Sequence, residues 1–385
     1  MAKKEKCPVN PRLGVVGGQA VVEGVMMKSG SNMAIASRMF DGSIKVTKSK
    51  LTSAKDRHKI LGLPIIRGAV NFVEMMALSF KTMDTAAEAL GLEEEEPTKF
   101  EKWLAEKLHI SVTTFVTIVG GVLGVLLSVA LFMFLPGAAG KGISALFEKI
   151  SGGTFKLSDH RILFSLIEGL IKIGVFLLYL FLVSLYKETR RLFEYHGAEH
   201  KSVFCYEAGE ELTPENVKKY SRFHPRCGTS FMFFMMIIGI IIGCFITTSI
   251  PILRTLIRLA LLPVTVGIGF EVIKYAGKHD NFIIRAISAP GLWVQRITTK
   301  EPDEKQIECA IAALKSALPD VFPGYDPEAQ FGPFEHKEKA KEKGNIKLIF
   351  AYARKIEKEQ SAHRRVVLSQ MTPKERARYR QREKR

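Results

Sequence analysis

The sequence is poor in cysteine and has no N-terminal apolar core. Its 385 residues include only five cysteines, an odd number that lie far apart in the sequence, and this excludes a framework of disulfides. We therefore expect the polar parts of the chain to lie in a reducing compartment. The first twenty residues contain no unbroken apolar run, so we expect no cleavable signal peptide.

Acidic residues are also few, with 39 Asp and Glu against 56 Lys and Arg. Several long stretches carry no charge at all, whereas the last fifty residues are dense in charge. This segregation excludes a purely soluble enzyme. It predicts a mainly α-helical, polytopic membrane protein with about four transmembrane helices and a small N-terminal β-hairpin region on the cytosolic side.

Four apolar stretches predict the spanning helices of a transmembrane core over residues 110–273. A hydrocarbon core about 30 Å thick requires roughly 20 residues of helix. The second stretch contains Glu168 and Lys172, which are four positions apart and share a helix face; we expect them to neutralise each other, or else to mark a polar pathway. The predicted spans are residues 110–135, 162–186, 230–253 and 255–273.

The distribution of Lys and Arg orients these spans. Residues 1–109 contain 17 of them, residues 187–229 contain 8 and residues 274–385 contain 24, but residues 136–161 contain only 4. Because positively charged segments remain in the cytosol, we expect a multi-pass protein of the plasma membrane with both termini cytosolic. Only the loop 136–161 and the turn near Pro251 would face outward.

Three cytosolic segments carry local structural signals. Residues 1–60 contain two runs in which apolar and polar residues alternate, on either side of an Asp-Gly pair. This pattern predicts a β-hairpin. Residues 61–109 begin with an apolar stretch interrupted by Pro and charge, which favours an interfacial or re-entrant helix over a fifth span. Residues 274–332 predict an amphipathic helix that starts at Asp303.

Residues 333–385 form a basic tail. They contain 17 Lys and Arg against 7 Asp and Glu, a net charge of +10. Such a charge attracts phosphate-bearing polyanions, so the expected partners are the ribosome, RNA or anionic membrane lipids. The alternative is a solvated arm that only favours the cytosolic orientation.

The most specific motif is His196-Gly197-Ala198-Glu199-His200. Residues four apart lie on one face of a helix, so His196 and His200 can bind one metal ion while Glu199 acts as the catalytic base on a water molecule. The motif matches the H-x-x-E-H pattern of inverted zinc peptidases. The alternative is a set of polar residues that caps the cytosolic end of the second span.

A second pair of candidate ligands, His224 and Cys227, comes just before the third span, and Cys205 lies close to the first pair in the sequence. If His196, His200, His224 and Cys227 all bind, the site is a closed, structural tetrahedron. If only three protein groups bind, a position remains open for catalysis. The expected ion is divalent, and zinc suits these ligand types.

Two acidic residues are further candidates. Glu271 is expected near the cytosolic end of the fourth span, where an isolated carboxylate faces the protein interior, and it is the candidate third ligand of an open site. Its alternative is a salt bridge to Lys274 or to a neighbouring helix. Glu23 lies within the Gly-rich stretch 17–27, where it would line the site or cap a backbone group.

Together these motifs resemble the YqhQ-like family of bacterial membrane proteins, over about residues 12–318. The resemblance implies a bacterial integral membrane protein, because the members are of that kind. Their function is unknown, and they are described as metal-dependent enzymes. The tail after residue 333 lies outside the resemblance. The segments that carry it are residues 17–27, 196–201, 224–229, 275–277, 289–295 and 298–302.

The sequence therefore supports two main hypotheses. The first is an integral membrane metal-dependent hydrolase with its site at the cytosolic membrane face. The second is a non-enzymatic membrane factor with a structural metal knuckle, whose basic tail docks on the ribosome, RNA or a membrane assembly partner. A third, a transporter that uses Glu168, Lys172 and Glu271, is disfavoured by the absence of repeated or discontinuous spans.

Overall fold

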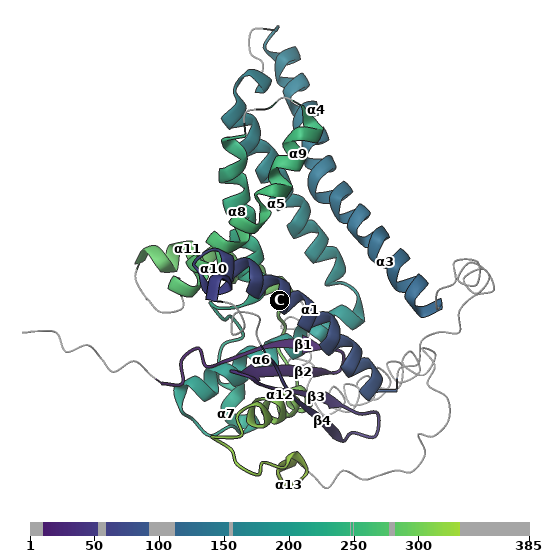
Figure 1. Cartoon of the computed structure of the whole chain (residues 1–385), viewed down its shortest axis with the longest axis vertical. Coiled ribbons are helices and arrows are strands. Elements are labelled where there is room, and N and C mark those ends of the chain that lie inside the picture. Colours follow the sequence, from purple (N-terminus) through teal and green to yellow (C-terminus); the bar gives the residue numbers. More distant parts are fainter. Residues whose placement is uncertain are drawn as a thin grey trace, which may run out of the picture.

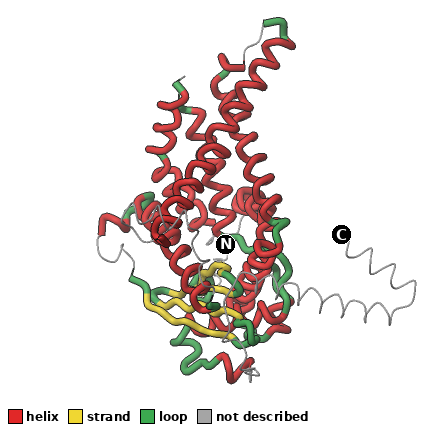
Figure 2. The backbone as a smooth tube through the Cα atoms, turned by 90° about the vertical axis from the view of Figure 1, so that its right-hand side faces the viewer, coloured by secondary structure: helices red, strands yellow, loops and turns green. Residues whose placement is uncertain are grey.

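The computed structural model describes residues 11–52, 59–91, 112–153, 157–246, 248, 250–276 and 282–331. These residues are mainly helical and include one small antiparallel sheet. Long helices form a bundle that stands on a layered part containing the sheet (Figures 1 and 2). Predictions for the tail 333–385 and for residues 92–109 lie outside the described residues.

The sheet is a four-stranded meander whose strand order follows the chain. The predicted hairpin is confirmed as the last two strands, and the turn between them holds Gly42 at a φ of 91° while Asp41 accepts a hydrogen bond from the backbone of Ser43. The Gly-rich stretch 17–27 adds two strands that the sequence pattern did not predict. The strands are β1 (Val16–Val21), β2 (Gly24–Ser29), β3 (Asn32–Arg38) and β4 (Ile44–Lys50).

Different helices cover the two faces of the sheet. Helices α6 (Lys187–Ala208) and α12 (Glu304–Ala317) pack on one face, and α1 (Ile66–Ala89) packs on the other. Side chains alternate accordingly, since Met27 joins the core with α6 and α12 while Met26 joins the core with α1. The sheet therefore separates two distinct environments.

Helix α12 confirms the amphipathic helix predicted from Asp303. Its start is a capping box formed by Asp303 and Gln306, which satisfies free amides of the first turn. The helix is more buried than its single apolar face predicts, because the sheet covers one side and α6 covers another.

Two long apolar helices dominate the bundle. The first runs without a break through α3 (Val112–Val129), the π-helical η3 (Ala130–Phe134) and α4 (Leu135–Ile150). The second is α5 (Arg161–Val183). Residues 136–150, predicted to lie in an outward loop, are therefore part of a helix; the span Val119–Ile150 is 32 residues long.

The prediction of four spanning helices is wrong for the described part of the chain, which contains two or three. α8 (Gly228–Cys244) has only 17 residues. α9 (Pro251–Ala260) and α10 (Leu262–Ala276) are bent by 43° and count at most as one broken span. Pro263, at the second position of α10, lacks the amide that would continue α9, so the helix breaks there.

The remaining elements join the two parts. α1 confirms a helix within residues 61–85; it packs along α10 where the bundle meets the sheet (Figure 1) and is not among the helices apolar enough to cross a membrane. α11 (Phe282–Thr298) packs against α8 and leads into α12. The short elements are η2 (Lys59–Gly62), η4 (Leu157–Asp159), α7 (Pro214–Lys218) and α13 (Pro327–Phe331).

Candidate metal centre

Three of the predicted ligands come together where α6 meets the start of α8. The ligand atoms of His196, His200 and Cys227 all lie within 4.8 Å of one another, and Cys227 Sγ is 3.3 Å from His196 Nε2. With bond lengths of about 2.0–2.3 Å, a tetrahedral zinc ion places its ligand atoms roughly 3.5 Å apart. The donor set therefore fits such an ion after small side-chain adjustments.

Helix α6 positions the two histidines as the motif predicts. Their rings lie side by side with centroids 4.4 Å apart, because residues four apart share a helix face. Gly197 between them is required by packing: a Cβ atom there would overlap the carbonyl oxygen of Lys300. The glycine that weakens the helix thus allows the connection between α11 and α12 to cross α6 closely.

Backbone carbonyls orient both imidazole rings. His196 Nδ1 lies 2.9 Å from the carbonyl oxygen of Thr298, and His200 Nδ1 lies 2.5 Å from that of Arg222. A carbonyl only accepts hydrogen bonds, so each Nδ1 carries the proton and donates it. Each Nε2 therefore faces the common centre, where the neutral ring offers a lone pair, as in metal-binding histidines.

Charge interactions stabilise the ionised forms of Cys227 and His196. Burial opposes protonation of His196, but the Cys227 sulfur outweighs it and raises the pKa of His196 to about 9. Burial likewise opposes ionisation of Cys227, whereas His196 and His200 together lower the pKa of its thiol well below the usual range. Cys227 is also the N-cap of α8, where a helix terminus favours a thiolate, the form that binds metals.

Glu199 lies beside the three ligands. Its Oε2 atom is 3.8 Å from His196 Nε2 and 3.9 Å from His200 Nε2. Gly18 of β1 packs against this side chain, since a Cβ at Gly18 would lie 2.9 Å from Glu199 Cγ. At Gly18 the backbone of the sheet thus approaches Glu199 closely.

His224 is near the group but is not part of it. Its ring centroid is 5.4 Å from that of His200, and its Nδ1 accepts a hydrogen bond from the backbone of Arg226 at 3.3 Å. Gln295 of α11 holds its backbone by accepting from the amide at 2.7 Å and donating to the carbonyl at 2.7 Å. The closed tetrahedron that includes His224 is therefore not formed in this arrangement.

The other candidates lie elsewhere. Glu271 accepts two hydrogen bonds from Arg67 of α1, at 2.7 and 2.5 Å, which matches the predicted alternative of a salt bridge to a neighbouring helix. Glu23 forms an ion pair with Arg191. Cys205 is in the hydrophobic core, where burial raises the pKa of its thiol to about 11. None of these three belongs to the ligand group found among the described residues.

Sequence reasoning missed the residues that hold the ligands in place. The carbonyls of Thr298 and Arg222 and the side chain of Gln295 act through backbone contacts, which leave no recognisable residue pattern. Two glycines were the available signal, because Gly18 and Gly197 both mark places where backbone segments pass close to the site.

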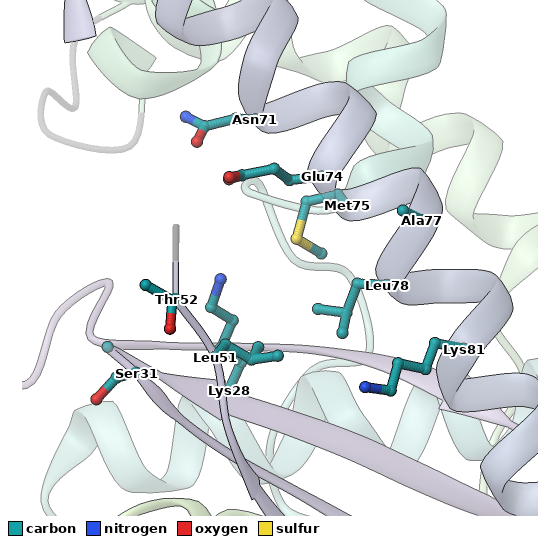
Figure 3. Close-up of a pocket in the computed structure, with 11 residues that line it drawn as sticks. Lys28, Ser31, Leu51, Thr52, Asn71, Glu74, Met75, Ala77, Leu78 and Lys81 are labelled. Carbon is teal, nitrogen blue, oxygen red and sulfur yellow. The ribbon is translucent and has the colours of Figure 1, made fainter. Parts of the chain in front are cut away.

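A separate groove of about 540 Å³ lies on the other face of the sheet, between α1 and the strand ends (Figure 3). Lys28 and Lys81 extend their amines into it. β1 divides it from the metal group: Gly18 packs on Glu199, whereas the next residue, Gln19, donates a hydrogen bond to Thr82 of α1 at 2.5 Å. The groove is therefore not an entrance to the ligand group.

The sequence model of DUF1385, a family of proteins of unknown function, matches residues 63–320. The chain belongs to this family. It is also similar to the uncharacterized protein YqhQ of Bacillus subtilis (strain 168), with 34% identity over 303 residues that cover 78% of this chain and 92% of the relative. The predicted resemblance to YqhQ-like proteins is thereby confirmed. The family match contains all three ligands and stops before the basic tail. No solved structure matches the chain significantly.

Proposed function

We propose that this protein is an integral membrane hydrolase of the bacterial plasma membrane that uses a divalent cation, most suitably zinc, held by His196, His200 and Cys227. The observation that supports it best is the convergence of two Nε2 atoms and the Cys227 sulfur, all within 4.8 Å of one another. A cation held there would supply a Lewis acid to polarise the reacting group. Three protein ligands leave one position free, as catalytic sites require.

Glu199 is the proposed general base. Its carboxylate is within 4 Å of both Nε2 atoms, so it can accept a proton from a water molecule that enters the group. The packing of Gly18 against its side chain restricts its movement. The protein thus holds the proton acceptor on the same helix turn as the two histidines.

We infer that the site lies at the cytosolic membrane face. Only residues 184–186 separate the end of α5 from α6, and Cys227 directly precedes α8, so both segments of the site lie at the base of the apolar bundle (Figure 1). The surrounding segments are rich in Lys and Arg, which favours a cytosolic location of this base and of both termini. Membrane lipids then surround the bundle.

A structural metal centre is the second candidate, because the group is strongly shielded from solvent. The side chains of His200 and Glu199 are 2% and 8% exposed, and Glu199 is close enough to become a fourth ligand. In that case the protein is a non-enzymatic factor, and the basic tail 333–385 docks on the ribosome, RNA or an assembly partner. The two candidates differ in what Glu199 does.

Substitution of Glu199 separates them. Metal content of the purified full chain and hydrolysis of casein and of nitrophenyl esters and phosphates would be measured for wild type, Glu199→Gln and the control Glu188→Gln, an exposed residue of the first turn of α6. A hydrolase predicts that Glu199→Gln keeps its metal and loses turnover by roughly 10²–10⁴-fold, while the control resembles wild type. A structural centre predicts loss of metal and a lower melting temperature. Turnover equal to that of wild type in Glu199→Gln would contradict the proposed base.

A further inference from the structure

A second charged cluster lies inside the bundle, on α5 and α9, in the half away from the sheet (Figure 1). Arg258 donates to both oxygens of Glu168, at 2.6 and 3.1 Å. Arg254 lies 3.1 Å from the same carboxylate and donates to the hydroxyl of Ser165 at 2.8 Å. Glu168 is 4% exposed and each arginine 18%, so the cluster is largely enclosed.

The positive charges in this cluster exceed the negative charge. Lys172 lies one helical turn from Glu168 on α5, and in the described part of the chain it makes no ion pair within 4 Å. The expected mutual neutralisation of Glu168 and Lys172 is therefore incomplete, since the carboxylate is already shared by two arginines. Three cations then face one carboxylate, a formal net charge of +2.

Among the described residues, the other groups packed around the cluster do not balance its net charge. They are the Ser165 hydroxyl, the carbonyl of Gly243, the ring of Phe164, 5.7 Å from the Arg254 guanidinium, and the Cys244 thiol. On α9 the leucines at 253, 256 and 259 form the outer face, since they are 43%, 55% and 58% exposed. Arg254 and Arg258 lie on the opposite, inner face of this helix. The arginines thus face the helices of the bundle, where unbalanced charge is costly.

We propose that this cluster is a binding site for a phosphate group, presented by an anionic lipid headgroup or by free phosphate. Guanidinium groups match phosphate oxygens in a planar, two-pronged arrangement, and the Lys172 ammonium adds a third donor. Glu168 keeps the arginines in place and competes with the ligand. Glu168 is seven residues after the start of α5, about 10 Å along the helix, so the site is reached from the leaflet opposite the metal centre.

The test uses the full chain in nanodiscs and measures its melting temperature. One arm compares neutral phosphatidylcholine with a mixture that contains phosphatidylglycerol; the other adds inorganic phosphate to the neutral nanodiscs. A rise only with phosphatidylglycerol identifies a lipid headgroup, and a rise with inorganic phosphate identifies the free anion. No rise in either arm overturns the proposal.

Two variants separate binding of the anion at this cluster from its general electrostatic attraction to the basic protein. Lys172→Met preserves side-chain volume and all the ion pairs of Glu168, and it should remove most of the ligand-induced rise. Lys149→Met, an exposed lysine in the last turn of α4, is the matched control and should retain the rise. An undiminished rise in Lys172→Met overturns the proposal.

Glu168→Gln tests the site in the opposite direction. It removes the competing carboxylate, so the free protein should melt at a lower temperature while the ligand-induced rise becomes larger than in wild type. A smaller rise in this variant means that the anion does not bind at the arginines, and it overturns the proposal.

Discussion

Cys227 and His196 are 31 positions apart in the sequence, yet the Cys227 sulfur lies 3.3 Å from His196 Nε2. The C-terminal end of α11 holds both segments in place, since the carbonyl of Thr298 accepts from His196 and the side chain of Gln295 binds the backbone of His224. The ligand group thus depends on three segments of the chain, and a bound ion would link α6 to the start of α8.

Because the chain crosses closely at Gly197, one methyl group added there should strongly lower the stability of the protein. Gly197→Ala should lower the melting temperature, by a destabilisation of about 1–3 kcal/mol, because the new Cβ displaces the carbonyl of Lys300. It should also reduce metal content, since the same connection orients His196. The control is Gly142→Ala in α4, where a Cβ meets nothing within 4 Å and the melting temperature should stay equal or rise. An unchanged melting temperature for Gly197→Ala would show that the crossing is not tight.

The lowered pKa of Glu207 predicts that the protein loses stability in acid. Burial opposes its ionisation, but interactions with His224, the amide of Gly14 and Arg226 outweigh burial and lower its pKa from 4.5 to about 2. A lowered folded-state pKa contributes stability above the unfolded value, and this contribution is lost as pH falls from about 4.5 towards 2. Glu207→Gln should therefore show a weaker decline of melting temperature over this window than wild type or Glu188→Gln. Parallel declines in all three proteins would contradict this.

The charge distribution predicts which side of the membrane each end of the bundle faces. In a variant without the other cysteines, a cysteine introduced at Gly152, between α4 and α5, should react with a membrane-impermeant maleimide added to intact cells. Cys227 alone should react only after the cells are opened and the protein is denatured. Labelling of Cys227 from outside would place the metal group on the other side.

The basic tail predicts a salt-sensitive association. If residues 333–385 dock on the ribosome or RNA, co-sedimentation should fall steeply with salt, because each neutralised phosphate releases counterions. Deletion of the tail should abolish co-sedimentation and leave metal content unchanged. Co-sedimentation that survives the deletion would assign it to another part of the chain.

Local patterns predicted the parts of this structure that depend on local geometry. His196 and His200 lie on one face because of the period of the helix. The turn at residues 41–42 follows from the preference of an Asp-Gly pair for hairpin turns. Hydropathy overestimated the number of spans, because residues 230–273 are apolar but break at Pro263 and place Arg254 and Arg258 inside the bundle.

Long-range contacts determine which candidate ligands lie together, and the sequence pattern did not contain this information. Glu271 was a candidate ligand by its depth in a helix, but Arg67, 204 positions earlier, binds it. His224 and Cys227 were equivalent by spacing. In the fold, the His224 ring lies against Glu207 and Arg226, with 3.3 Å between its Nε2 and the Arg226 guanidinium. Cys227 instead enters the ligand group.

The most direct test is the metal content of the purified full chain, measured by inductively coupled plasma mass spectrometry for wild type, for the double variant His196→Ala, His200→Ala, and for Cys227→Ser. The controls are His224→Gln and Glu271→Gln, whose side chains lie outside the ligand group. The account predicts a stoichiometric divalent metal in wild type and in both controls, loss of metal in the double variant, and a strong reduction in Cys227→Ser. Full metal content in the double variant would contradict the assignment of this site.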